Sequence, residues 1–186
     1  ASGSGAKGGD GGDIFGIRQN KDLNSAMNLL SAGNGGKATG PGGRGGDGGN
    51  VKDVKTIGFI GKPSDGTNSL GVFDSGRAQG VFAGVGGDGA TDGVNGSVTK
   101  ISARQIAAIG ANPDLAGLFG AATKIAKITA DLIGYDANGS GTYNNENNDA
   151  QNPAAVKPVD GFLFGSSIAN ITTFNPTRTQ AFTFVA

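Results

Sequence analysis

The sequence predicts an all-β fold, namely a right-handed parallel β-helix (β-solenoid) of about five irregular coils with long Gly-rich inserts and little helix. Two observations support this prediction. A short apolar signature recurs along the chain, which is typical of repeat architectures. Gly also supplies 37 of the 186 residues, about three times its usual share of roughly 7%. Because Gly adds no side chain to a core, this excess indicates a role in backbone geometry.

The recurring signature places Ile or Val three residues apart, behind a small or polar residue. Its five copies are GDIFGI (12–17), GNVKDV (49–54), GSVTKI (96–101), TKIAKI (123–128) and SSIANI (166–171). This spacing fits no simple strand alternation, so the chain must bend between the two apolar positions. Parallel stacking of the copies about 4.8 Å apart would satisfy their backbone groups and align the apolar side chains. The predicted core ladder is Ile14, Ile17, Val51, Val54, Val98, Ile101, Ile125, Ile128, Ile168 and Ile171.

Segments of unequal length separate the copies, as insertions do where they leave the flanks of a solenoid. The predicted organisation is a Gly-rich N-terminal arm at 1–13, a β-solenoid at 14–175 with inserts at 31–49, 61–96 and 136–160, and a C-terminal strand at 176–186. Gly dominates the insert at 31–49, which could form ordered strands of polyglycine-II type or mobile loops. Order is favoured, because GGDGG precedes two signature copies.

One stretch has a helical alternative. Residues 101–133 carry Ala, Leu and Ile at near-helical spacing, and Asn112 with Pro113 resembles a helix start. Gly110, Gly117 and Gly120 interrupt that pattern. Strands are therefore the favoured interpretation.

Composition excludes several classes of function. Lys plus Arg equals Asp plus Glu at 15 each, so no long-range field favours nucleic acid. The chain has no Cys and no His, which removes thiol chemistry and the commonest general base. No apolar run approaches the roughly 18 residues of a spanning helix, so membrane insertion is not expected. The start at Ala1, in ASGSGAKG, is typical of a mature secreted chain, although any shortened chain would look the same.

With its GGDGG, IxxI and DLIG elements, the chain resembles the Gly-rich parallel β-helix repeats of large secreted bacterial surface and filament proteins. The resemblance covers most of the chain and rests on the combination of these elements, since no single motif is diagnostic. It implies an extracellular or cell-surface location and a structural or adhesive role. It supplies no catalytic residue.

Acidic residues suggest two kinds of metal site, and both have a simpler explanation. A Ca²⁺ loop is the alternative interpretation for Asp136, Asn138, Ser140 and Glu146, but Glu146 falls one position short of the loop pattern. A solvated insert tip explains the same residues through turn preference. The second kind of site is a Gly- and Asp-rich Ca²⁺-binding repeat, but the sequence lacks the strict period of such repeats. Turn formation is therefore favoured for Asp10, Asp13, Asp47, Asp88 and Asp92. No cofactor is expected.

An enzyme is not expected either. Some parallel β-helices are polysaccharide lyases, which use acidic side chains and a basic residue. Nothing in the sequence gathers the residues that could act in this way, which are Asp53, Asp88, Arg104 and Asp131.

The expected function is a structural subunit of an extracellular filament or surface layer, which assembles head-to-tail with copies of itself. The C-terminal segment NPTRTQAFTFVA alternates apolar and polar residues, as a strand with one apolar face does. It could close its own solenoid or add to a neighbouring subunit. The predicted assembly residues are Ile14, Phe15, Ile17, Phe182, Phe184 and Val185. The alternative is a monomeric adhesin or glycan-binding module that uses Tyr135 and Tyr143.

Overall fold

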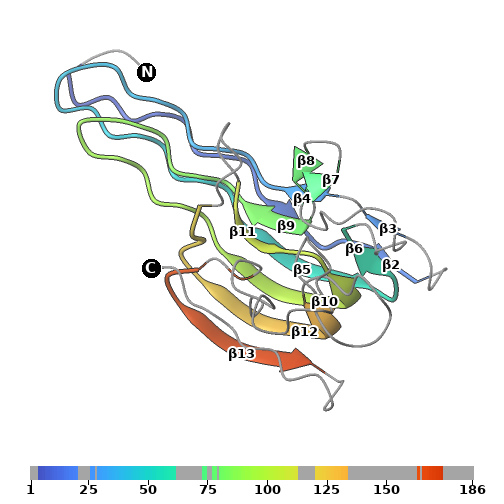
Figure 1. Ribbon diagram of the computed structural model, residues 1–186. Helices are drawn as coiled ribbons and strands as arrows, with labels where there is room; N and C mark the ends of the chain where they lie inside the picture. Colours follow the sequence, from blue (N-terminus) through green and yellow to red (C-terminus); the bar gives the residue numbers. More distant parts are fainter. Residues whose placement is uncertain are drawn as a thin grey trace, which may run out of the picture.

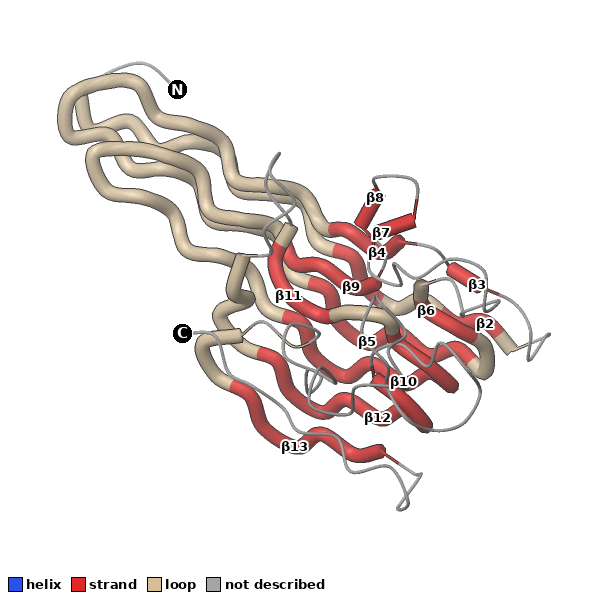
Figure 2. Tube along the Cα trace, viewed as in Figure 1, coloured by secondary structure: helices blue, strands red, loops and turns tan. Residues whose placement is uncertain are grey.

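The computed structural model describes residues 4–20, 26–27, 29–61, 73–74, 77–78, 80–112, 120–133, 163 and 165–173. In these residues the secondary structure consists of strands and loops without a helix (Figure 2). The prediction of an all-β fold with parallel sheets is confirmed for the described chain. The described part of 101–133 is strand and loop, so the helical alternative is wrong there.

The larger sheet is formed by the signature copies, and its main path is parallel throughout. Its strands lie in the order β1-β5-β10-β12-β13, which is also their order in the chain (Figure 1). Their bounds are Ile14–Phe15 (β1), Val51–Thr56 (β5), Val98–Ile106 (β10), Ile125–Ile133 (β12) and Ile168–Thr173 (β13). Three short strands extend this sheet beside the main path, namely β2 (Arg18–Gln19), β3 (Ala26–Met27) and β6 (Phe59–Ile60).

A second, three-stranded sheet is also parallel and has the order β11-β9-β4. Its strands are β4 (Leu29–Ser31), β9 (Gly80–Ala83) and β11 (Ile109–Ala111). The chain alternates between the two sheets, since β4 follows β1, β9 follows β5 and β11 follows β10. Buried residues of both sheets belong to one apolar cluster. Strands β7 (Phe73–Asp74) and β8 (Arg77–Ala78) form a separate two-stranded antiparallel sheet.

The signature residues are in register across the larger sheet. The first ladder position aligns Ile14, Val51, Val98, Ile125 and Ile168. The second aligns Val54, Ile101, Ile128 and Ile171. The residues on β5, β10 and β12 are at most 1% exposed, whereas Ile14, Ile17, Ile168 and Ile171 are partly buried against the cluster.

A left-handed residue explains how two apolar side chains three positions apart reach the same core. Each copy has a positive φ immediately before its second ladder residue. The values are +77° at Gly16, +61° at Asp53, +56° at Lys100, +59° at Lys127 and +56° at Asn170. Such a residue bends the strand and shifts the in–out alternation by one position, as in a β-bulge. The burial pattern of β5 shows this shift, since Val51 and Val54 are both buried.

The left-handed positions lead to a first testable prediction. Replacing Lys127 by Gly should raise the free energy of unfolding by about 1 kcal/mol, because a side chain costs about that much in a left-handed conformation. Replacing it by Val should lower stability, since β-branched residues tolerate positive φ poorly. Lys127 is exposed, so packing should contribute little. Urea denaturation measures both effects.

Lys124 is the matched control, because it is also exposed and its φ is not positive. There the change to Gly should destabilise the protein by roughly 0.5–1 kcal/mol through backbone entropy. The same sign of change at both positions would contradict the proposed role of the left-handed residues.

The Gly-rich segments form a bundle of extended strands that projects beyond the sheets (Figures 1 and 2). Their hydrogen bonds recur every third residue, the period of a polyproline-II-type helix. The N–H groups of Gly8, Gly11 and Ile14, for example, donate to the carbonyls of Arg44, Asp47 and Asn50. The segments involved are 6–13, 32–38, 43–50, 83–88 and 91–97. The described part of the 31–49 insert is therefore ordered, as the sequence favoured.

The bundle has two layers. Segments 6–13, 43–50 and 91–97 run parallel in one layer, because the hydrogen-bonded residue numbers rise together. Segments 32–38 and 83–88 form the second layer in the same way. Bonds between the layers run antiparallel, as in the donation from Gly33 N–H to Gly12 and from Gly36 N–H to Gly9. The bundle thus continues the strand stacking of the sheets with Gly at most of its interior positions.

Candidate functional site

The two outer edges of the larger sheet are the first candidate site. Strands β1 and β13 end the main path, and the described residues supply no further strand beyond either of them. Ladder residues at these ends are only partly buried, although their register neighbours Val51, Ile125 and Ile128 are 0% exposed. The ladder side chains are therefore fully buried in the middle of the stack and partly exposed at both of its ends.

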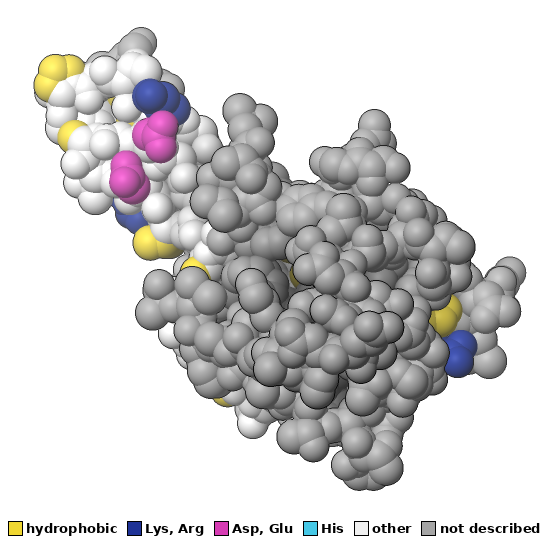
Figure 3. Space-filling model, in the orientation of Figure 1, with side chains coloured by type: hydrophobic (Ala, Val, Ile, Leu, Met, Phe, Trp, Pro, Cys, Tyr) yellow, Lys and Arg dark blue, Asp and Glu magenta, His cyan; other side chains and the backbone are white. Residues whose placement is uncertain are grey.

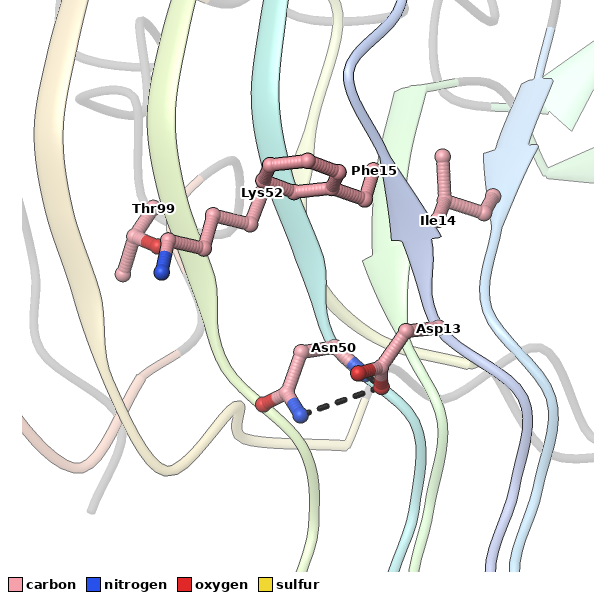
Figure 4. A pocket seen from close by; sticks show the side chains of 6 residues that line it. All are labelled: Asp13, Ile14, Phe15, Asn50, Lys52 and Thr99. Atoms are coloured by element: carbon pink, nitrogen blue, oxygen red, sulfur yellow. Dashed lines mark hydrogen bonds between the residues drawn. The ribbon is translucent and has the colours of Figure 1, made fainter.

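Phe15 is the most exposed large apolar residue of the described chain, with 68% of its surface accessible. It lies on β1, where its register partner on β5 is Lys52. A groove of about 400 Å³ adjoins it (Figure 4). The lining residues are Asp13, Ile14, Phe15, Asn50, Lys52 and Thr99. An aromatic ring beside a carboxylate, an amide and an ammonium group suits contact with another polar chain.

Every third residue of the outer bundle segments carries a side chain, in the patterns KGGDGGD (7–13) and RGGDGGN (44–50). These side chains link neighbouring segments by accepting backbone N–H donors. Asp10 Oδ1 accepts the N–H of Asp47 at 2.8 Å, and Asp47 Oδ1 accepts that of Val94 at 3.0 Å. In the same way Asp13 accepts the N–H of Asn50 at 2.6 Å, and Asn50 accepts that of Ser97 at 2.9 Å.

This pattern corrects the interpretation of the Asp residues as turn formers. Asp10, Asp13 and Asp47 lie in extended segments, and their short side chains reach the next segment of the layer. Asp92 does fit the prediction, since its carboxylate accepts the N–H of Gly89 at a hairpin tip. Asp88 lies 3.5 Å from the Lys37 ammonium group.

Three further ion pairs reinforce the bundle surface, where cationic and acidic side chains gather (Figure 3). Lys7 Nζ lies 2.7 Å from Asp10 and 3.4 Å from Asp47, and Arg44 lies 2.8 Å from Asp47. The hydrogen bond from Lys7 lowers the pKa of Asp10, and the N–H of Val94 is the main cause of the lowered pKa of Asp47. The hydrogen bond to Asp10 in turn raises the pKa of Lys7.

These pKa shifts predict how the stability of the bundle depends on pH. Asp10 and Asp47 contribute stability above their ordinary pKa of 3.8, and this contribution is lost as the pH falls through their lowered pKa values. Lys7 contributes below 10.5, and its contribution is lost as the pH rises through its raised pKa. The urea midpoint should therefore be flat between these limits and fall on both sides.

Asp47→Asn is the informative variant, because the amide oxygen can still accept the N–H of Val94 while the charge is gone. The fall in the urea midpoint at acid pH should become smaller in this variant, and so should the fall at alkaline pH, where Lys7 has lost one partner. If the urea midpoint fell equally at acid pH in the variant and in the unmodified protein, Asp47 would not be a cause of that fall.

Other predicted site residues are placed apart or lie outside the described residues. Asp53 pairs with Arg18 at 2.7 Å, whereas the Arg104 guanidinium lies 5.2 Å from the Phe59 ring centroid. Asp53 and Arg104 are thus engaged with different partners. The predicted site residues that lie outside the described residues are Tyr135, Asp136, Asn138, Ser140, Tyr143, Glu146, Phe182, Phe184 and Val185, together with the side chain of Asp131.

Sequence reasoning missed the linking roles of Lys7, Arg44 and Asn50. The signal was the three-residue period of the X-G-G pattern. Among the described residues, no group of three or more acidic side chains could hold a metal ion, and no helix could span a membrane. Comparisons with protein-family models, with curated proteins and with solved structures gave no match.

Proposed function

We propose that this chain is a non-enzymatic structural subunit of an extracellular filament or surface layer, and that it assembles head-to-tail with copies of itself. In this proposal the two sheets belong to a right-handed β-solenoid of about five coils. Right-handed crossovers between parallel strands are the strong rule, and the alternation of the chain between the two sheets fits a solenoid.

The observation that carries the proposal is the partial burial of the ladder at both ends. Ile14 and Ile17 at one end, and Ile168 and Ile171 at the other, pack against the core while keeping exposed surface. Exposed edges of this kind invite pairing with another chain unless they are capped. A head-to-tail contact that does not close on itself generates a fibre.

The bundle suits a structural role as well. It projects from one side of the sheets (Figure 1), and its charged groups are paired with one another in Lys7–Asp10 and Arg44–Asp47. Such a projection would decorate the outside of a filament and leave the strand edges accessible. The balanced charge of the chain, with 15 cationic and 15 acidic residues, would not oppose close association of copies.

The test is assembly of the purified protein. Light scattering should show growth with concentration, and negative-stain microscopy should show filaments or sheets. Deletion of Phe182 to Ala186 tests whether the C-terminal segment contributes, because weakened assembly would assign this segment a part in the contact. A protein that stays monomeric at high concentration would overturn the proposal.

A second candidate is a monomeric adhesin or glycan-binding module, and the groove at Phe15 favours it. Sugars bind where an exposed aromatic ring lies beside polar side chains, as Asp13 and Asn50 do here. This candidate predicts glycan-array binding by a monomer, without filaments. Phe15→Ala and Asn50→Ala should then abolish binding, whereas loss of binding only on deletion of 136–149 would locate the site in that insert.

A further inference from the structure

The larger sheet contains one hydrogen bond that is repeated from strand to strand. The N–H of the first ladder residue always donates to the carbonyl of the residue that precedes the ladder on the next strand. The bonds are Ile14 to Asn50 (2.8 Å), Val51 to Ser97 (2.9 Å), Val98 to Lys124 (2.8 Å) and Ile125 to Ser167 (2.8 Å). Every donor therefore points in the same direction along the stack.

The two ends of this series are complementary. At the β13 end, the equivalent donor is the N–H of Ile168, and at the β1 end the equivalent acceptor is the carbonyl of Asp13. Neither group has a hydrogen-bond partner among the described residues. A copy shifted along the stack would bring the Ile168 donor to the Asp13 acceptor and add one more bond of the same kind.

Side chains at the two ends also match in size. The row next to the first ladder position contains Phe15, Lys52, Thr99, Ala126 and Ala169 in register. It is buried at Ala126 and exposed at both of its ends. It begins with the exposed Phe15 and ends with the small, exposed Ala169. The strand bend matches too, because Gly16 and Asn170 both have a positive φ.

We infer that β13 of one copy pairs in parallel and in register with β1 of the next copy. Ile14 then lies beside Ile168, Ile17 beside Ile171 and Phe15 beside Ala169, so that the larger sheet and its apolar ladder continue across the joint. This inference rests on the proposed head-to-tail assembly and specifies its contact. Five strands spaced about 4.8 Å apart make each copy advance the stack by about 24 Å.

The occupant of the β1 edge is therefore β13 of a second copy, and not the C-terminal segment 176–186 that the sequence suggested. The bond series is the reason for this choice. Strand β13 offers the Ile168 donor at the place that continues the four existing bonds, and it already carries the required bend at Asn170.

Disulfide trapping tests the register, since the chain has no Cys of its own. Neighbouring residues of paired strands fall within the Cα separation that a disulfide needs, roughly 4.4–6.8 Å. Phe15→Cys protein is mixed with Ala169→Cys protein and oxidised. We expect a covalent dimer that contains one copy of each, at about tenfold the yield obtained with Thr172→Cys, which lies about 10 Å farther along the strand.

Each outcome of this experiment decides one question. A chain that carries both Phe15→Cys and Ala169→Cys should give a ladder of covalent multimers. Filaments under the microscope without the Phe15–Ala169 link would overturn the joint but leave the proposed assembly intact. Linking of Phe15→Cys to Phe184→Cys instead would assign the edge to the C-terminal segment. Absence of any assembly by the unmodified protein would overturn the proposed function itself.

Discussion

Replacing Gly11 by Ala should disrupt the Gly-rich bundle, whereas replacing its neighbour Gly12 by Ala should not. A Cβ atom on Gly11 would lie 1.9 Å from the carbonyl oxygen of Gly33, which is backbone and cannot rotate away. A Cβ atom on Gly12 would meet nothing within 4 Å. Overpacking of a well-packed site costs about 1–3 kcal/mol, and we expect Gly11→Ala to reach the upper end of that range or exceed it.

The comparison isolates the close approach from other effects of the mutation. Both residues lie in the same extended segment and neither has a positive φ. The added methyl group should therefore lower the entropy of the unfolded chain equally at both positions, which stabilises the folded state by about 0.4–1 kcal/mol. Gly12→Ala should therefore be neutral or slightly stabilising. Urea midpoints and hydrogen exchange of the bundle amides measure the difference. Equal effects at the two positions would mean that the segments are not packed against each other.

The core ladder could be predicted because the sequence states it directly. Ile and Val recur at a fixed offset, and parallel strands with matching apolar positions have one register that buries them all. The left-handed residues could not be predicted in the same way. Gly16, Asn170 and Asp53 are of residue types that are enriched at positive φ, but Lys100 and Lys127 are not, so residue type alone did not mark this position in every copy. Their conformation follows from burial of the apolar residues on both sides.

The two-layer arrangement of the bundle could not be predicted from the sequence. The bonds between its two layers join Gly to Gly, as between Gly33 and Gly12. A run of Gly residues does not specify which other run it pairs with. The X-G-G period nevertheless contained part of the answer. It places Asp10 and Asp47 on one side of their segments, where they bond to the next segment. Turn preference, which is a statistical property of Asp, pointed to the wrong role for these residues.

Ile128→Ala should cause a large loss of stability in the larger sheet. Ile128 is 0% exposed and lies between Ile101 and Ile171 in the second ladder position. Truncation of a buried Ile to Ala costs about 2–5 kcal/mol, because apolar contact is lost and a cavity remains. Ile128→Val should cost only about 0.5–1.5 kcal/mol. Urea denaturation of the monomer, at a concentration below assembly, measures both values.

The same truncation at Ile171 connects the core with the proposed assembly. In the monomer, Ile171→Ala should cost less than Ile128→Ala, because Ile171 keeps exposed surface. In the assembled state Ile171 gains a neighbour in Ile17 of the next copy, so that both residues occupy interior positions of one ladder. The penalty at Ile171 should then approach that at Ile128, and the concentration needed for assembly should rise. If the penalty at Ile171 were the same in monomer and assembly, the ladder would not continue across the joint.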